Sequence, residues 1–284
     1  MSLVVANYAE LYHDLRLLLL NSDIVSSRIC DTKEAIGVKF TLINPRARLG
    51  YHKDRGFNLP FALSEFIFDV SGMNDVVVSG SINKKTFDYS DYGNTFHGAY
   101  GPRISPHLGK IIEILKRDSN SRQAVINIYN SQDMYANTKD IPCTISLQFF
   151  VRNKKLDMIV SMRSNDFFWG LQYDLFRFTM LQEVIAYELG VGLGCYHHLA
   201  GSLHVYKHHW EMLDKIEDME SVEMPSLNLG ISSCFKIAHQ MCGLVENADV
   251  ALDSPILCII ASKFFPSFIM PVKEWASKFI TKKE

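Results

Sequence analysis

The order of apolar patterns along the chain predicts a mixed α+β fold. Residues 6–20 and 59–70 place apolar side chains at helical spacing, and Gly72 ends the second run. Three later runs are rich in Val, Ile and Phe and are separated by polar turns: residues 123–129, 144–151 and 156–162. This succession of helices and strands is typical of a mixed sheet covered by helices.

Further segments complete the expected order. Residues 37–44 indicate a strand, and another strand ends near Tyr206. Three more helices are expected at residues 107–116, 167–189 (closed by Gly190) and 208–218. Residues 81–103 lack a clear period and predict a long loop, a feature that is often functional. The remaining C-terminal residues predict two or three helices and contain no interpretable motif.

Composition favours one large globular unit. The 284 residues, 48% of them apolar, provide enough material for a buried core, so a single domain over residues 1–284 is expected. The formal net charge is −2, whereas proteins that grip nucleic acid usually carry a basic excess. We therefore expect no nucleic-acid partner.

The chain also predicts a reduced, cytoplasmic protein without a membrane partner. Apolar runs such as residues 17–20 and 256–260 are far shorter than the roughly 20 residues that a bilayer requires. The first residues, MSLVVANYAELYHD, lack the layout of a secretory signal. The six cysteines are scattered without a Cys-x-x-Cys pair, which predicts no metal site and no disulfide framework.

Three short segments between residues 118 and 210 belong together. They are IPCT at 141–144, MRSND at 162–166 followed by Trp169-Gly170 and Asp174, and GSLHVY at 201–206. Taken singly, each has an ordinary explanation: Cys143 as a buried thiol, Asp166 as a helix cap, or His204 as a core histidine. Their order and spacing instead indicate one site.

These segments resemble the thymidylate synthase family over most of the first 210 residues. The matching positions are Ser121-Arg122, Pro142-Cys143, Arg163-Ser164-x-Asp166, Trp169-Gly170 and His204-x-Tyr206. Two earlier matches are Glu65, in LSEFIFDVSGMN, and Tyr100-Gly101. The resemblance implies a homodimer whose sheets pack against each other, and 5,10-methylenetetrahydrofolate as cofactor.

The resemblance also implies a role for each matching residue. Cys143 is expected to add to carbon 6 of the pyrimidine, as a thiolate whose pKa Arg163 lowers. Glu65 is expected to move protons through ordered water. The other expected substrate-binding residues are Arg163, Ser164 and the partner's Arg122 around the phosphate, Asn165 at the base or phosphate, His204 and Tyr206 at the sugar, and Asp166, Gly170 and Tyr100 by their place in the motifs.

The sequence departs from the family pattern at several positions. Gln123 stands where a second arginine often follows Arg122, and Arg28 is the nearest, out-of-register match for an early phosphate-binding arginine. Thr144 replaces the usual histidine after the nucleophile, and Phe87 is aligned with a bulky indole. The tail ITKKE does not resemble the apolar tail of thymidylate synthases.

Asp174 predicts a cytosine base. Thymidylate synthases carry asparagine there, which suits the ring N–H and carbonyl of uracil. Cytosine presents a ring acceptor and an amine, which a carboxyl group matches by sharing a proton and accepting from the amine. A carboxylate facing the uracil carbonyl leaves a buried mismatch of about 1–3 kcal/mol. Asparagine can rotate to suit cytosine, so the argument concerns preference.

The leading hypothesis is therefore hydroxymethylation of a pyrimidine nucleoside monophosphate, CMP or dCMP, because the motifs look most like the dCMP and CMP hydroxymethylases. The resemblance then implies that water rather than hydride completes the reaction. Two alternatives stay open. One is a thymidylate synthase-type methyltransferase acting on dUMP or dCMP, and the other is a nucleotide-binding protein that has lost catalysis.

Overall fold

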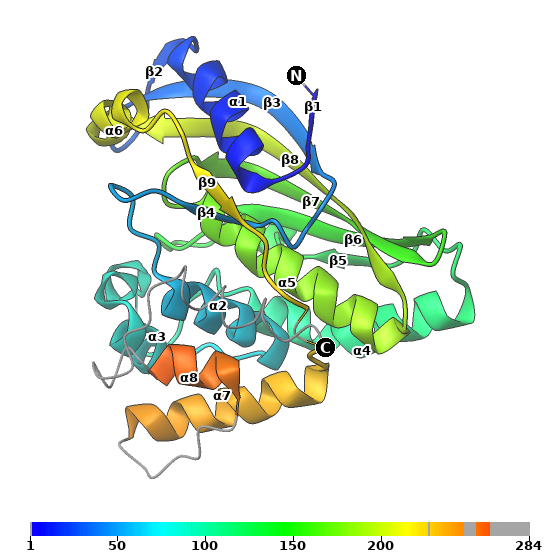
Figure 1. The fold of residues 1–284 in the computed structure, drawn as a ribbon. Coiled ribbons are helices and arrows are strands. Elements are labelled where there is room, and N and C mark those ends of the chain that lie inside the picture. The colour runs from blue at the N-terminus through cyan, green and yellow to red at the C-terminus, as the bar shows by residue number, and fades with distance from the viewer. Residues whose placement is uncertain (1, 92, 227, 247–253, 262–284) are drawn as a thin grey trace.

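One mixed sheet forms the centre of the molecule (Figure 1). The computed structural model describes residues 2–91, 93–226, 228–246 and 254–261. The strand order is β1-β3-β8-β7-β6-β5, with β2 paired to β3, and β4 and β9 form a separate two-stranded sheet. The pairs β1–β3 and β7–β8 are parallel, and the other neighbours in the large sheet are antiparallel.

The strands of the described residues differ greatly in length. They are β1 (Ser2–Val5), β2 (Ile24–Ser26), β3 (Asp31–Leu42), β4 (Leu49–Tyr51), β5 (Val125–Asn127), β6 (Thr144–Arg152), β7 (Lys155–Asp166), β8 (Gly192–Tyr206) and β9 (Glu220–Val222). The four longest, β3, β6, β7 and β8, are adjacent in the sheet and form its stable centre.

The helices of the described residues surround this sheet. They are α1 (Tyr8–Leu20), α2 (Leu59–Ser71), α3 (Val76–Ile82), α4 (Gly101–Arg117), α5 (Leu171–Leu189), α6 (Trp210–Lys215), α7 (Ile231–Val245) and α8 (Pro255–Ala261). Short 3₁₀ helices occupy Lys84–Tyr89, Ser131–Met134 and Lys207–His209.

The helices form successive layers below one face of the sheet. Helix α5 packs on β7 and β8, α2 packs on α5, and α7 and α8 pack on α2. Figure 1 shows α7 and α8 as the outermost layer. Because α2 lies between two helical layers, nine of its residues are buried, including the polar Ser64 and Asp69. The layer between α2 and α5 is where the site described below lies.

Most of the predicted elements are present. Gly72 and Gly190 end α2 and α5 with φ of 79° and 67°, a left-handed conformation that glycine adopts at little cost. The strands at 123–129, 144–151 and 156–162 correspond to β5, β6 and β7. Two of the expected C-terminal helices are α7 and α8, whereas the tail ITKKE lies outside the described residues.

The predicted loop at residues 81–103 is wrong at both ends. Helix α3 ends at Ile82, a 3₁₀ helix follows, and α4 begins at Gly101 rather than at residue 107. Pro106 inside α4 hid its first turn, although Pro102 suits that position and Ile104 is fully buried. Tertiary packing therefore extends this helix toward the nucleophile.

Other boundaries also moved. Strand β3 begins at Asp31 rather than at residue 37, because its polar first half pairs with β8. The expected helix at 208–218 is a 3₁₀ turn followed by the short α6. Helix α5 starts at Leu171, so Asp166 ends β7 and does not cap the helix. All six cysteines are free, and no helix in the described part of the chain has the length and apolarity needed to cross a membrane.

Candidate active site

Two adjoining cavities lie between α2, α5 and the ends of β6 and β7. The smaller has a volume of about 270 Å³ and is lined by Cys143, Tyr100 and Asp140 among others. The larger has a volume of about 820 Å³ and is lined by Asp166, Asp174 and Tyr206 among others. Phe61, Glu65, Thr86 and Tyr89 line both, so the two cavities form one continuous site. Their combined size suits small organic ligands.

Cys143 immediately precedes β6 and is held by the neighbouring strand. The Arg163 backbone N–H donates to the Cys143 carbonyl at 2.8 Å. The Arg163 side chain donates from Nε to the Pro142 carbonyl and from Nη2 to the Ile141 carbonyl, both at 3.0 Å. Burial raises the pKa of the Cys143 thiol, although Arg163 acts to lower it. The expected net lowering is therefore wrong for the protein without substrate, because desolvation outweighs the guanidinium.

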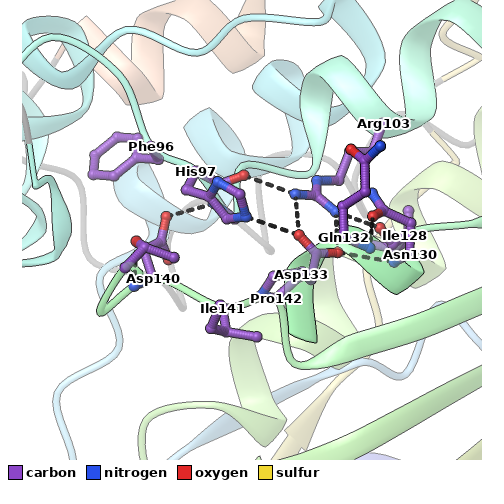
Figure 2. A network of polar contacts seen from close by, with 12 residues as sticks. Phe96, His97, Arg103, Ile128, Asn130, Gln132, Asp133, Asp140, Ile141 and Pro142 are labelled. Carbon is purple, nitrogen blue, oxygen red and sulfur yellow. Dashed lines mark hydrogen bonds and ion pairs between the residues drawn. The ribbon is translucent and has the colours of Figure 1, made fainter. Parts of the chain in front are cut away.

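The loop before Cys143 is tied to the start of α4 by a polar network (Figure 2). Arg103 donates from Nη1 and Nη2 to the two oxygens of Asp133, at 2.7 and 2.8 Å, and His97 Nε2 lies 2.8 Å from Asp133 Oδ1. Burial raises the pKa of Asp133, but hydrogen bonds from Arg103 and the Asn130 backbone bring it down to about 2. Asp140 also accepts from the Gly98 N–H at 2.8 Å. The nucleophile loop is therefore fixed by charge at two points.

Tyr100 connects α4 to the residue after the nucleophile. The Thr144 N–H and hydroxyl donate to the Tyr100 oxygen at 3.1 and 3.0 Å. Thr144, which departs from the family's usual histidine, therefore positions the tyrosine. Burial raises the pKa of Tyr100, so its hydroxyl stays protonated at the wall of the smaller cavity.

Asp174 lies in the first turn of α5 and lines the larger cavity. Asn165 Nδ2 donates to Asp174 Oδ2 at 2.8 Å, while Asn165 Oδ1 is buried without a partner among the described residues. Burial raises the pKa of Asp174 to about 6. A Cβ at Gly170 would lie 2.9 Å from the Asp166 carbonyl, so only glycine fits beside this pair. Asn165 and Gly170 thus orient the carboxyl group.

The strand ends place Asp166, His204 and Tyr206 on one edge of the larger cavity. Asp166 on β7 pairs in register with His204 on β8, and its Oδ1 accepts from the Phe168 N–H at 2.9 Å. His204 is 6% exposed, and its ring meets the Tyr206 ring edge-on at 5.0 Å. Asp166 and Tyr206 line the cavity, whereas His204 lies behind them.

The expected phosphate ligands are less well assembled in one chain. Arg28 and Arg122 are exposed, and neither lines these two cavities; Arg28 lies next to Ile29, which does. Ser164 is half-buried on β7, opposite Ser202 on β8. Lys85 and His208, which the sequence analysis did not select, line the larger cavity. Phe87 is exposed and packs against Gly80.

The sequence analysis also missed Arg177 on α5. Its guanidinium lies 3.0 Å from Glu65 and 2.5 Å from Asp69, both on α2. The available signal was an arginine three residues after Asp174, on the same face of an otherwise apolar helix. No group of three or more His, Cys, Asp or Glu side chains suited to a metal occurs among the described residues.

The sequence pattern of thymidylate synthases matches residues 90–247 of this chain. That match covers more than half of the 284 residues and includes Cys143, Asp174 and Tyr206. The chain therefore belongs to the thymidylate synthase family. The predicted family and α+β fold class are confirmed, and family membership indicates a one-carbon transferase that uses methylenetetrahydrofolate.

Curated relatives come from bacteriophages. The chain is 34% identical over 216 residues to the deoxyuridylate hydroxymethyltransferase of Bacillus phage SP01, which covers 69% of this chain and 56% of that protein. It is 34% identical over 182 residues to that of Pseudomonas phage M6, covering 61% and 51%. It is 29% identical over 227 residues to that of Delftia phage PhiW-14, covering 72% and 61%.

The chain thus spans only about half to three fifths of the length of these relatives. They are named for deoxyuridylate rather than for a cytosine nucleotide. The expected closer likeness to the dCMP and CMP hydroxymethylases is therefore not confirmed.

Proposed function

We propose that this chain transfers a one-carbon unit from methylenetetrahydrofolate to carbon 5 of a pyrimidine nucleoside monophosphate and delivers it as hydroxymethyl. The observation that carries the proposal is the adjoining pair of cavities, with the Cys143 thiol on one, the Asp174 carboxyl on the other and Glu65 on both. The names of the curated relatives support hydroxymethyl rather than methyl as the product.

The larger cavity suits the folate and the nucleotide together. Its walls carry aromatic side chains on which flat rings stack, and Lys85 and His208 are available to anionic groups. The aromatic residues are Phe57, Phe61, Tyr89, Trp169, Tyr173 and Tyr206. When bound, methylenetetrahydrofolate supplies the one-carbon unit.

The protein's own residues divide the remaining work. Cys143 adds to carbon 6 of the base, which makes carbon 5 nucleophilic. Because burial keeps the thiol protonated, its proton must leave as the sulfur attacks. Glu65, whose pKa burial raises to about 7, is suited to accept and return protons near neutral pH.

For the base, Asp174 supports cytosine. The Asn165 amide donates to Oδ2, so a proton on Asp174 resides on Oδ1. The carboxyl group then offers one donor and one acceptor, and when ionised it still accepts from an amine while sharing a proton with the ring nitrogen of cytosine. Cytosine is therefore accepted in both protonation states.

A second candidate substrate is dUMP, which the names of the relatives favour. With its pKa raised to about 6, Asp174 is partly protonated near neutrality, and its O–H can face the uracil carbonyl. Uracil binding then weakens as the pH rises above 6, whereas cytosine binding does not.

The deciding experiment incubates the protein with methylenetetrahydrofolate and CMP, dCMP or dUMP, and identifies the products by mass spectrometry. A hydroxymethylated cytosine nucleotide without formation of dihydrofolate is expected, and the CMP-to-dCMP ratio settles the sugar. A hydroxymethylated uracil nucleotide instead supports the second candidate. A methylated product together with dihydrofolate would overturn hydroxymethyl transfer. Cys143→Ser is the control, expected to bind nucleotide but form no product.

We also propose that a second copy of the chain packs against the free face of the sheet. Opposite the helices, β6, β7 and β8 carry Phe150, Ile159 and Leu199, which stay partly exposed, Leu199 at 41%. A sheet with apolar side chains on both faces favours a covering partner. Arg122, exposed in this chain, is then available to the partner's phosphate site.

Sedimentation of Leu199→Glu tests the dimer. A monomer is expected for this variant, while Phe235→Glu, an exposed apolar site on α7, should leave the dimer intact. For Arg122, mixing the inactive Arg122→Ala and Cys143→Ala variants should restore about a quarter of the wild-type sites by subunit exchange. No recovery on mixing would contradict a shared site.

A further inference from the structure

Arg177 is a buried cation whose hydrogen bonds all join α5 to α2. Its side chain is 12% exposed. Nε donates to Asp69 Oδ2 at 2.7 Å, Nη2 to Asp69 Oδ1 at 2.5 Å and Nη1 to Glu65 Oε1 at 3.0 Å. The guanidinium also lies 4.6 Å from the centre of the Tyr100 ring. It therefore contacts both the expected proton carrier and the tyrosine beside the nucleophile.

The two carboxylates that Arg177 holds differ in what they leave free. Asp69 is completely buried, and both of its oxygens accept from Arg177. This bidentate pair makes Asp69 the fixed counter-ion of the guanidinium. Glu65 has only Oε1 engaged; its Oε2 accepts no hydrogen bond from the described residues, and its side chain is 21% exposed. Oε2 is therefore available to the cavities.

Charged groups face Glu65 from each neighbouring element. Asp69 lies on its own helix, Asp174 and Arg177 on α5, and Tyr100, a neutral phenol, at the start of α4. Among the described residues that line the smaller cavity, Arg177 is the only lysine or arginine. The charge of Glu65 thus depends on one cation and two nearby carboxyl groups.

We propose that Arg177 is the positioning residue of this site: it fixes Glu65 through Oε1, directs Oε2 to the substrate and sets the pH at which Glu65 exchanges protons. Asp69 sets how much of the guanidinium charge reaches Glu65. The proposal rests on the proposed function, because it assigns Glu65 the transfer of protons to and from the substrate.

Two substitutions should move the pH profile in opposite directions. In Arg177→Met, Glu65 faces Asp69 and Asp174 without a cation, so its carboxylate is disfavoured and the acidic limb of kcat/KM moves up by about one pH unit or more. In Asp69→Asn, one carboxylate is removed while Arg177 stays, so the limb moves down. A purely structural Arg177 would lower activity equally at every pH.

A fold control accompanies the pair. Arg177→Met leaves Asp69 buried without its counter-ion, which destabilises the fold. The double variant Asp69→Asn, Arg177→Met removes both charges together, and its limb should lie between those of the single variants. An acidic limb that stays at the wild-type pH in Asp69→Asn and in the double variant overturns the proposal.

A readout without turnover separates this proposal from the proposed function. The carboxyl band of Glu65, assigned in infrared difference spectra by its loss in Glu65→Gln, reports its protonation in the protein alone. The band should titrate at higher pH in Arg177→Met and at lower pH in Asp69→Asn. If no pyrimidine nucleotide is turned over, the proposed function fails, yet the infrared titration still confirms or refutes the role of Arg177.

Discussion

Helix α5 carries two arginine–carboxylate clusters that differ in one respect. In the first, Glu183 accepts from Arg46 Nε at 3.1 Å through Oε1 and from Arg48 Nη2 through Oε2, so both of its oxygens are occupied. In the second, Arg177 occupies both oxygens of Asp69 but only one of Glu65. The first cluster is closed, and the second is open toward a cavity.

The difference appears in the acids themselves. Burial acts to raise the pKa of Glu183, but Arg48 and Arg46 together hold it below its usual value. Burial raises the pKa of Glu65 to about 7 in spite of Arg177. A closed cluster keeps its charge and stabilises the fold, whereas an open one keeps a group able to exchange protons.

The largest expected effect comes from breaking the open cluster. Glu65→Gln should lower kcat by roughly 100- to 10,000-fold, because a positioned proton carrier is lost. Nucleotide affinity and the unfolding midpoint should change little. Steady-state kinetics with isothermal titration of the nucleotide check this, and a variant that keeps the wild-type rate would remove the role of Glu65.

Breaking the closed cluster should act on stability instead. Glu183→Gln leaves Arg48, which is completely buried, without its carboxylate. The free energy of unfolding should fall by about 3–5 kcal/mol, with kcat per folded molecule unchanged. Denaturant titration together with active-site counting measures both quantities. A loss of kcat at full stability would erase the distinction between the clusters.

A smaller effect is expected one helical turn away from Arg177. Asp174→Asn should shift the ratio of kcat/KM for cytosine over uracil nucleotides toward uracil by about 10- to 100-fold, since a buried mismatch costs about 1–3 kcal/mol. Competition between dCMP and dUMP measures the ratio. An unchanged ratio would mean that Asp174 does not read the base.

The smallest effect is on the pH dependence of stability, where the clusters should have opposite signs. The pKa of Glu65 rises from 4.5 to about 7 on folding, so the folded state keeps a proton that the unfolded state loses, and stability falls as the pH rises through that range. The pKa of Glu183 is lowered, so its contribution is present above 4.5 and is lost as the pH falls.

Unfolding titrations across this range check the sign. In Glu65→Gln the decline between pH 4.5 and 7 should become shallower, and Asp174, with its pKa of about 6, accounts for part of what remains. In Glu183→Gln the loss of stability in acid should become shallower. A decline above pH 4.5 that is as steep in Glu65→Gln as in the wild type would contradict the assignment.

The sequence analysis placed Cys143, Glu65, Asp174 and Tyr206 correctly in one site, because motif order is visible without a structure. Arg28 and Arg122 do not line that site, and Arg122 depends on a second copy. The start of α4 was hidden because Pro106 breaks the local pattern, while Ile104 and Leu108 bury themselves only against the rest of the fold. Arg177 was missed because its partners lie more than a hundred positions away in the chain.

By itself, the sequence determined which elements form and which residues are available to the chemistry, since helical and strand periods and the spacing of IPCT and MRSND are local properties. Only the tertiary structure decided which charges meet and how deeply they are buried. The pKa of Glu65 depends on α2 packing against α5, and that of Cys143 depends on burial that exceeds the influence of Arg163. Electrostatic energies follow distance and solvent exclusion in space, and neither can be obtained from spacing along the chain.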